Sequence, residues 1–374
     1  FEEVNLANDH NQLVMDIMRK VAKKHKFKVL FHEKPYAGVN GSGKHNNWSM
    51  STETGINLLK PGKTPKMNLQ FLTFLVNVVK AVKQHSDLMR ATIMSSGNQH
   101  RLGANEAPPA IISVFLGHKV HSMLNEIEER ISDKKMTPDE KTEIKLDIGK
   151  IPDILLDNTD RNRTSPFAFT GNRFEFRAVG SYENNAGPMI ALNTAVADQL
   201  IQFKKDVTAL IEKKVKKDEA IFQILRKYII ESKSVRFEGN GYSKEWEREA
   251  EKRGLSNIKS ASEAYKAYIS KETIGLYERN NVLNGKELNS RYEIKISEYV
   301  KKIQIEARVL GDLAINHIIP TAIKYQGNLI SSVKDLKVIL EDEKEFKDLA
   351  GRRIKTIKTI AEHTTAVKNL VDEM

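Results

Sequence analysis

The chain has 374 residues, of which 40% are hydrophobic, enough for one large domain or two ordinary domains with buried cores. Its formal net charge is +11, but the 60 Lys and Arg residues alternate with 49 Asp and Glu residues along segments with helical patterns, so we expect no nucleic-acid partner. The sequence has no cysteine, which excludes disulfides and thiolate metal sites and leaves His, Asp and Glu as metal ligands.

The apolar runs and the first residues of the chain indicate where in the cell the protein is found. No apolar run reaches the length of a membrane-spanning helix, and the first residues lack the pattern of a signal peptide. We therefore expect a cytoplasmic protein with no membrane partner. The chain enters a helical pattern directly after Phe1, with no preceding turn, so we also expect that an N-terminal portion is missing from it.

The first predicted element is an amphipathic helix over residues 6–24. Its apolar residues fall at positions 13, 14, 17, 18 and 21, which lie on one face of a helix. Asn8 or Asp9 is expected to cap its first turn. The apolar run from Phe27 to Phe31 then predicts a strand.

Residues 33–49, which we call the signature loop, carry the strongest local signal. Three glycines within six residues, Gly38, Gly41 and Gly43, allow the backbone to approach an anion closely. His45 follows as a possible metal ligand, and the residues from Trp48 onward alternate as a strand does. A strand, a glycine loop with a histidine and a second strand together indicate a ligand site.

The P-loop is one alternative for this loop, because Gly38 to Lys44 match Gly-x-x-x-x-Gly-Lys. A P-loop needs a hydroxyl residue next and then opens a helix whose N-terminus holds phosphate. His45 occupies the hydroxyl position, and the residues after it suit a strand better than a helix. These differences disfavour a P-loop.

The middle of the chain offers charged residues with more than one interpretation. A buried helix is predicted over residues 67–83 and a polar loop over residues 95–99, and Arg101 and Glu106 then lie on a loop closed by two prolines. Taken alone, Arg101 and Glu106 would be a surface ion pair. A helix over residues 118–132 and a charged strand over residues 141–148 are expected next.

A third charged segment follows at residues 157–180. It contains Arg163 and then an alternating stretch in which a strand would direct Arg173, Glu175 and Arg177 to one face and two phenylalanines to the other. Taken alone, that charged face would be solvated. From residue 189 the pattern changes to long amphipathic helices, predicted over residues 190–214, 219–233, 294–313 and 329–371, with breaks at residues 239–241 and 284–285.

Several of these segments together resemble one enzyme family. The signature loop is similar to the Lys-Pro-x-x-Gly-x-Asn-Gly-Ser-Gly-x-His motif of glutamine synthetases, and its Gly-Lys-His-Asn-Asn-Trp-Ser ending resembles the type III class. The loop with Arg101 and the strand at residues 173–177 resemble further motifs of the family, and residues 301–312 resemble the C-terminal region of type III members. The resemblance implies an α+β fold: a partial catalytic domain over residues 1–215, with a curved antiparallel sheet and helices, and a helical extension over residues 216–374.

The resemblance also implies roles for individual residues. The expected ligands of Mg²⁺ or Mn²⁺ are Glu3, His45 and Glu175. The residues expected to bind glutamate are Asn40, Gly41, His45, Arg101 and Arg177, and those expected to bind ATP are Asn47, Ser49, Arg163 and Arg173. Glu106, Arg163 and Arg101 are expected to act in catalysis. Two departures stand out: Ala168 occupies the place of a second arginine, and the segment between Arg101 and Glu106 is one residue shorter than in type I enzymes.

The implied activity is ATP-dependent ligation of ammonia to glutamate through γ-glutamyl phosphate. The implied assembly is a dodecamer of two hexameric rings with active sites shared between subunits, in which further metal ligands and an aspartate that handles ammonium come from outside this chain. Two alternatives remain open. One is a γ-glutamyl ligase for another amine, and the other is an inactive scaffold or regulatory homologue.

Overall fold

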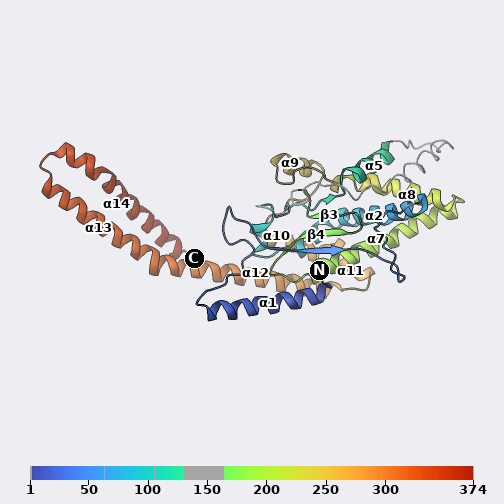
Figure 1. Cartoon of the computed structure of the whole chain (residues 1–374), viewed down its shortest axis with the longest axis horizontal. Helices are drawn as coiled ribbons and strands as arrows, with labels where there is room; N and C mark the ends of the chain where they lie inside the picture. The colour runs from blue at the N-terminus through green and yellow to red at the C-terminus, as the bar shows by residue number, and fades with distance from the viewer. Residues whose placement is uncertain (1, 63, 105–106, 130–163, 374) are drawn as a thin grey trace. The chain divides into compact units, whose positions relative to one another are not determined.

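The computed structural model describes residues 2–62, 64–104, 107–129 and 164–373 (Figure 1). Two compact units are present, Phe1–Ile296 and Ser297–Met374, and each is described by itself. The predicted strand over residues 141–148, Glu106 and Arg163 lie outside the described residues. No helix in the described part of the chain is both long and apolar enough to cross a membrane.

The first unit contains a four-stranded sheet. Its strands are β1 (Gly43–Trp48), β2 (Val114–Phe115), β3 (Phe167–Phe169) and β4 (Phe174–Gly180), in the spatial order β1-β4-β3-β2. β4 is antiparallel to both β1 and β3, whereas β2 is parallel to β3. The α+β class expected from the sequence is confirmed, and the sheet is mixed rather than wholly antiparallel.

One face of the sheet carries a cluster of phenylalanines. The rings of Phe167 and Phe174 stack with centroids 4.6 Å apart, and Phe169 lies 5.7 Å from Phe71 of helix α2 (Pro65–Gln84). The alternation predicted for residues 173–177 is confirmed, since Phe174 and Phe176 are fully buried on this face. The opposite face is solvated only in part, because Arg177 on it is just 2% exposed.

Helices surround this sheet in the first unit. Those not already given are α1 (Val4–Lys24), α3 (Ser86–Thr92), α4 (Asn98–Arg101), α5 (His118–Glu129), α7 (Ala186–Glu212), α8 (Lys217–Glu231), α9 (Lys244–Lys252), α10 (Ala261–Tyr265) and α11 (Lys271–Arg279). The helices predicted over residues 67–83, 190–214 and 219–233 are confirmed as α2, α7 and α8. α2 begins two residues earlier than predicted, because Thr64 accepts a hydrogen bond from the amide of Met67 and caps the helix.

The start of the chain differs from prediction in two details. α1 forms as expected, but its cap is Glu3, whose Oε2 accepts a hydrogen bond from the amide of Leu6 at 3.3 Å. Asn8 instead donates to the carbonyl of Val4 inside the helix. The strand predicted over Phe27 to Phe31 is wrong: Phe27 is 75% exposed, and no strand among the described residues pairs with this run.

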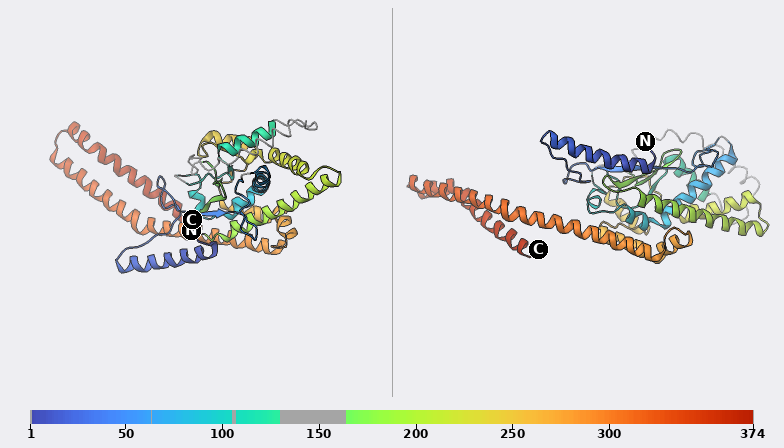
Figure 2. Two further views of the ribbon diagram at one scale, coloured as in Figure 1. Left: turned by 45° about the vertical axis from the view of Figure 1, so that its right-hand side comes forward. Right: turned by 90° about the horizontal axis from the view of Figure 1, so that it is seen from below.

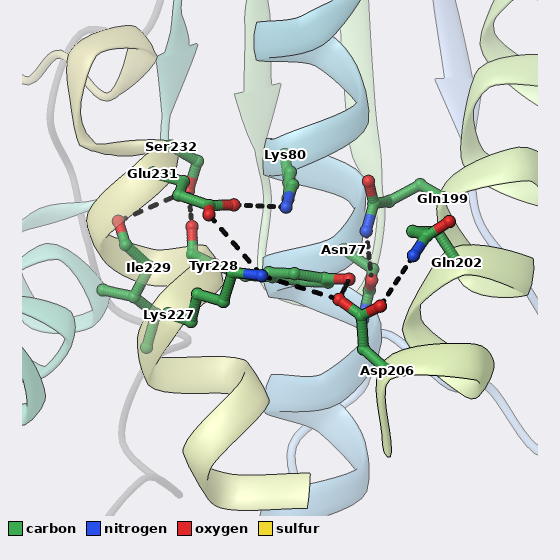
Figure 3. A network of polar contacts seen from close by, with 10 residues as sticks. All are labelled: Asn77, Lys80, Gln199, Gln202, Asp206, Lys227, Tyr228, Ile229, Glu231 and Ser232. Carbon is green, nitrogen blue, oxygen red and sulfur yellow. Dashed lines mark hydrogen bonds and ion pairs between the residues drawn. The ribbon is translucent and has the colours of Figure 1, made fainter. Parts of the chain in front are cut away.

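A polar network joins α2, α7 and α8 (Figure 3). Tyr228 donates to Oδ2 of Asp206 at 2.8 Å, and Gln199 donates to Oδ1 of Asn77 at 3.0 Å. The ammonium of Lys80 lies 3.3 Å from the centroid of the Tyr228 ring. Because α8 packs on α2 and α7, the compact unit continues past residue 215, and the domain division expected there stays a prediction.

The second unit is helical. α12 (Gly285–Leu313) begins at the predicted break inside the first unit, and its residues from Ser297 onward belong to the second. A π-helical turn, Ala314–Ile318, then leads into α13 (Ile319–Ile339). α13 and α14 (Glu343–Asp372) lie side by side as a hairpin (Figure 2). The helix predicted over residues 329–371 is therefore interrupted, at a turn where Asp342 accepts hydrogen bonds from the amides of Lys344 and Glu345 and starts α14.

Candidate active site

The strands β1 and β4 direct polar side chains away from the phenylalanine face. Asn47 pairs with Glu175, and directly opposed residues of an antiparallel pair point to the same face. Between the pairs Lys44 with Val179 and Asn46 with Phe176, the register shifts by one residue, so His45 stands opposite two residues of β4. Such a bulge bends the strand and redirects a side chain.

His45 and Glu175 form the central pair of this face. Nδ1 of His45 lies 2.8 Å from Oε1 of Glu175, and the two side chains are 48% and 19% exposed. An imidazole and a carboxylate at a solvent-accessible position can serve as ligands of Mg²⁺ or Mn²⁺. Within the described ranges, no three His, Asp or Glu side chains form a metal-sized cluster, and Glu3 caps α1.

Arg101 approaches the same strands from α4 and is buried. Its Nη1 donates to Oδ1 of Asn98 at 3.1 Å and to the carbonyl of Val179 at 3.3 Å, and its Nη2 donates to the carbonyl of Arg177 at 3.4 Å. Burial lowers the pKa of Arg101, and the nearby Glu33 carboxylate opposes that effect. The guanidinium is therefore fixed against the backbone of β4.

The glycines of the signature loop make room for this arginine. A Cβ on Gly43 would overlap Nη2 of Arg101. A Cβ on Gly41 would lie 2.6 Å from the carbonyl oxygen of Glu33 and 2.8 Å from Cγ of Arg101. The spacing of Gly41 and Gly43 is thus explained by a close approach between the loop and Arg101.

Glu33 is a residue of this region that sequence reasoning missed. It is only 5% exposed, and its carboxylate lies so close to Gly97 and Gly180 that a Cβ on either would overlap it. Its Oε1 accepts a hydrogen bond from the amide of Tyr182 at 3.2 Å, and its charge favours the protonated form of Lys44 as well as of Arg101. Glu33 is a buried counter-charge, and its position before Lys34-Pro35 was the only signal in the sequence.

The remaining arginines of β4 differ in exposure. Arg177 is buried and donates to the carbonyl of Ser165 at 2.6 Å. Arg173 is exposed just before the strand. Ser49 is also exposed, and its hydroxyl donates to the carbonyl of Asn172 at 3.0 Å. Because Asn172 directly precedes Arg173, Ser49 lies close to the start of β4. Residues expected to bind ATP therefore lie at one end of the β1–β4 pair.

The predicted site residues thus fall into three groups. The structure brings one group together around β1 and β4: Gly41, His45, Asn47, Ser49, Arg101, Arg173, Glu175 and Arg177. Asn40 is exposed on the loop directly before Gly41, and Glu3 lies at the start of α1. Glu106 and Arg163 are outside the described residues. Ala168 pairs with Glu175 across β3 and β4 and is fully buried, so no arginine stands at that place.

Two family models match the chain. The first, for the glutamine synthetase catalytic domain, matches residues 1–114, and the second, for the glutamine synthetase C-terminal domain, matches residues 220–337. The chain belongs to the glutamine synthetase family. Both models come from the same family and lie in the same order as the predicted catalytic part and extension.

Relatives of known name agree with this family. The chain is 56% identical to a glutamine synthetase of Bacteroides fragilis (strain YCH46) over 374 residues, covering 100% of this chain and 51% of the relative. It is 45% identical to a type-3 glutamine synthetase of Dictyostelium discoideum over 347 residues, covering 92% of this chain and 46% of the relative. A glutamine synthetase of Butyrivibrio fibrisolvens is 40% identical over 348 residues, covering 92% and 48%. The chain spans about half the length of the curated relatives it matches.

Proposed function

We propose that the protein containing this chain is a type III glutamine synthetase, a ligase that joins ammonia to L-glutamate with ATP as co-substrate. The observation that carries this proposal is the His45–Glu175 pair, 2.8 Å apart, on a sheet face that Arg101 and Arg177 approach. A member of this family that had lost its activity would have no physical need to keep His45 paired with Glu175.

The proposed reaction needs positive charge around several anionic groups. A carboxylate is a poor electrophile, and transfer of the γ-phosphoryl group of ATP activates it as γ-glutamyl phosphate. Arginine forks suit carboxylates and phosphates, so Arg101 and Arg177 would orient glutamate and Arg173 would contact the nucleotide. Asn40 and Gly41 would meet the amino acid, and Asn47 and Ser49 would meet ATP.

The proposed metal site uses the central pair. His45 and Glu175 fit Mg²⁺ or Mn²⁺, with Glu3 as a third candidate from the family resemblance. A divalent cation there would offset charge on the transferring phosphoryl group. Arg163 and Glu106 are proposed on resemblance alone, Arg163 to stabilise the phosphoryl group and Glu106 to exclude water and receive a proton from ammonium.

Three further features remain proposals. These are assembly into a dodecamer of two hexameric rings with shared active sites, a cytoplasmic location, and a division between catalytic part and helical extension near residue 215. The order of the two family models along the chain supports the division. The separate compactness of Ser297–Met374 shows only where contacts within the chain become sparse.

The test follows ATP-dependent phosphate release by the full-length protein with glutamate and Mg²⁺, with and without ammonium. We expect release that requires both substrates, yields glutamine and collapses in His45→Ala. His317→Ala is a matched control, because His317 is an exposed histidine of the second unit. Release that needs a different amine would identify a γ-glutamyl ligase of other specificity. No glutamate-dependent release from folded, assembled protein would favour the inactive homologue.

A further inference from the structure

Glu33 occupies the gap between the two elements that Arg101 joins. It is 5% exposed, and its carboxylate lies between Gly97, which precedes α4, and Gly180, which ends β4. A Cβ on Gly97 would lie 2.0 Å from Oε2 of Glu33, and a Cβ on Gly180 would lie 2.4 Å from Oε1. Both glycines therefore leave space for this carboxylate, which packs against the start of α4 and the end of β4 at once.

The backbone of Glu33 holds the signature loop at the same place. Its carbonyl oxygen accepts a hydrogen bond from the amide of Ser42 at 2.8 Å, and the carbonyl of Ser42 accepts one from the amide of Ser181 at 3.3 Å. The side chain adds a further link, because Oε1 accepts a hydrogen bond from the amide of Tyr182 at 3.2 Å. One residue thus connects the loop, the end of β4 and the start of the helix that carries Arg101.

Arg101 is a buried cation that needs a counter-charge. The acceptors that hold its guanidinium are neutral: the side chain of Asn98 and the carbonyls of Arg177 and Val179. Burial of a cation is costly unless an opposite charge lies nearby. Burial lowers the pKa of Arg101, and the charge of Glu33 is the largest effect that opposes it. Glu33 therefore supplies negative charge where the neutral acceptors cannot.

We propose that Glu33 is a positioning residue for glutamate binding, which keeps the guanidinium of Arg101 in the orientation that receives a carboxylate of the substrate. Glu33 acts through Arg101 and does not itself touch the substrate. The inference rests on the proposed function, because it takes Arg101 as a glutamate-binding residue. Glu33 lies at the end of the β1–β4 pair where Gly43 faces Gly180, and the residues proposed to bind ATP lie toward the other end. Loss of its charge should therefore affect glutamate and not ATP.

The test measures the KM for glutamate and the KM for ATP separately on the full-length protein. Glu33→Gln keeps the shape of the side chain and an acceptor for the amide of Tyr182, but it removes the charge. We expect the KM for glutamate to rise about fivefold or more, and the KM for ATP to stay within about twofold. A merely structural role would reduce the amount of active enzyme, and so the apparent kcat, without raising either KM.

A second variant moves the carboxylate without changing its charge. The backbone of Gly97, with φ of −81° and ψ of −46°, suits alanine, so Gly97→Ala adds no backbone strain. The three atoms nearest to the new methyl group all belong to Glu33. We expect the same selective rise in the KM for glutamate. In a Glu33→Ala background, where the obstructing carboxylate is gone, Gly97→Ala should raise this KM no further.

Two control variants match these changes. Glu128→Gln removes another carboxylate that faces a buried arginine, since its Oε2 lies 3.5 Å from Nη2 of Arg236. Gly187→Ala adds a methyl group inside α7, where the nearest atom, the carbonyl oxygen of Thr92, would lie at an ordinary 3.8 Å. Neither residue belongs to the β1–β4 face or to the signature loop, so both controls should leave the KM for glutamate unchanged.

A double variant shows whether Glu33 acts through Arg101. Arg101→Lys has already lost the fork that Glu33 orients, so adding Glu33→Gln should raise the KM for glutamate by less than about twofold further. Effects of the two substitutions that multiply fully, or an unchanged KM in both Glu33→Gln and Gly97→Ala, would overturn the proposal.

The wild-type protein separates this proposal from the ligase assignment. Normal turnover with an unchanged KM in the Glu33 and Gly97 variants would remove the positioning role and leave the proposed function intact. If the wild-type protein shows no glutamate-dependent turnover, the ligase assignment fails. The same double-variant comparison by urea unfolding then decides whether Glu33 holds Arg101: coupled effects on stability support that contact, and additive effects rule it out.

Discussion

Nδ1 of His45 lies 2.8 Å from Oε1 of Glu175, although 130 positions separate the two residues in the chain. The contact follows from the pairing of Asn47 with Glu175, because His45 lies two residues before Asn47 on β1 and so shares its face of the sheet. A slip of one residue in this pairing would turn His45 to the opposite face and away from Glu175. The geometry of this pair is therefore a property of the strand pairing and not of either residue alone.

The first prediction concerns this pair. Glu175→Gln keeps the shape of the side chain but removes its charge, and we expect the affinity for Mg²⁺ or Mn²⁺ to fall at least about tenfold. The melting temperature should change little, because glutamine keeps the shape of the Glu175 side chain and its Oε1 can still accept a hydrogen bond from Nδ1 of His45. Metal titration of the activity, with thermal unfolding in parallel, measures both effects. An unchanged metal dependence would remove Glu175 from the metal site.

The second prediction concerns the approach of Arg101 to the signature loop. In Gly43→Ala, the new methyl group would occupy the position of Nη2 of Arg101, so the guanidinium must move. We expect the KM for glutamate to rise about tenfold or more, with a smaller change in kcat, since substrate positioning is lost. Arg101→Lys should show a similar rise, because lysine cannot form the fork. If Gly43→Ala left the KM unchanged, Arg101 would not be the glutamate-binding arginine.

The third prediction concerns pH. Burial lowers the pKa of His85 to about 4, with the charge of Asp198 opposing and that of Arg279 adding to the effect. Because its pKa is lower in the folded state, His85 binds a proton more weakly there than in the unfolded chain. Its contribution therefore leaves the free energy of unfolding unaffected above the unfolded pKa of about 6.5 and lowers it as the pH falls toward 4. At about pH 5 the loss is about 2 kcal/mol.

The measurement for His85 is urea unfolding at about pH 7.5 and about pH 5. In His85→Gln, which cannot titrate, the decline between these two values should be smaller than in the wild-type protein by that amount. His317→Ala serves as the control, because an exposed histidine should leave the decline as it is. Equal declines in wild type and His85→Gln would show that other groups cause the acid sensitivity.

The fourth prediction compares two glycines with open space around them. Gly327 lies inside α13, and no atom lies within 4 Å of the position that a Cβ would take there, so Gly327→Ala should raise the free energy of unfolding by about 0.5–1 kcal/mol. Gly38 also has open space, but its φ of +82° is costly for alanine, and Gly38→Ala should destabilise by about 1 kcal/mol. Calorimetric unfolding measures both, and effects of the same sign would contradict the argument.

Local patterns predicted much of this fold. The apolar spacing identified α1, α2, α7 and α8, because a helix that buries one face must repeat its apolar residues. The alternation at residues 173–177 predicted which side chains of β4 face the phenylalanine cluster. Each of these features depends only on residues within one segment of fewer than 30 residues.

The failures involve partners that are far away in the chain. A strand needs a neighbouring strand, and the run from Phe27 to Phe31 has none among the described residues. The burial of Glu33 depends on Gly97 and Gly180, which lie more than 60 positions later. Arg90 is an ordinary helical arginine in the sequence, and only its contact with Ile258, 168 positions later, shows that it is buried with a free donor.

The two tryptophans of the chain occupy contrasting surroundings. Trp48 ends β1 with its indole hydrogen-bonded to Asn193 and part of its ring exposed, whereas Trp246 of α9 is 1% exposed and stacks on Phe237 with centroids 3.6 Å apart. Trp48 follows Asn47, which pairs with Glu175 at the candidate site. The emission of Trp48 should shift to longer wavelength and respond to soluble quenchers, while that of Trp246 should not. The chain thus carries two fluorescent reporters, one beside the candidate site and one in the buried core.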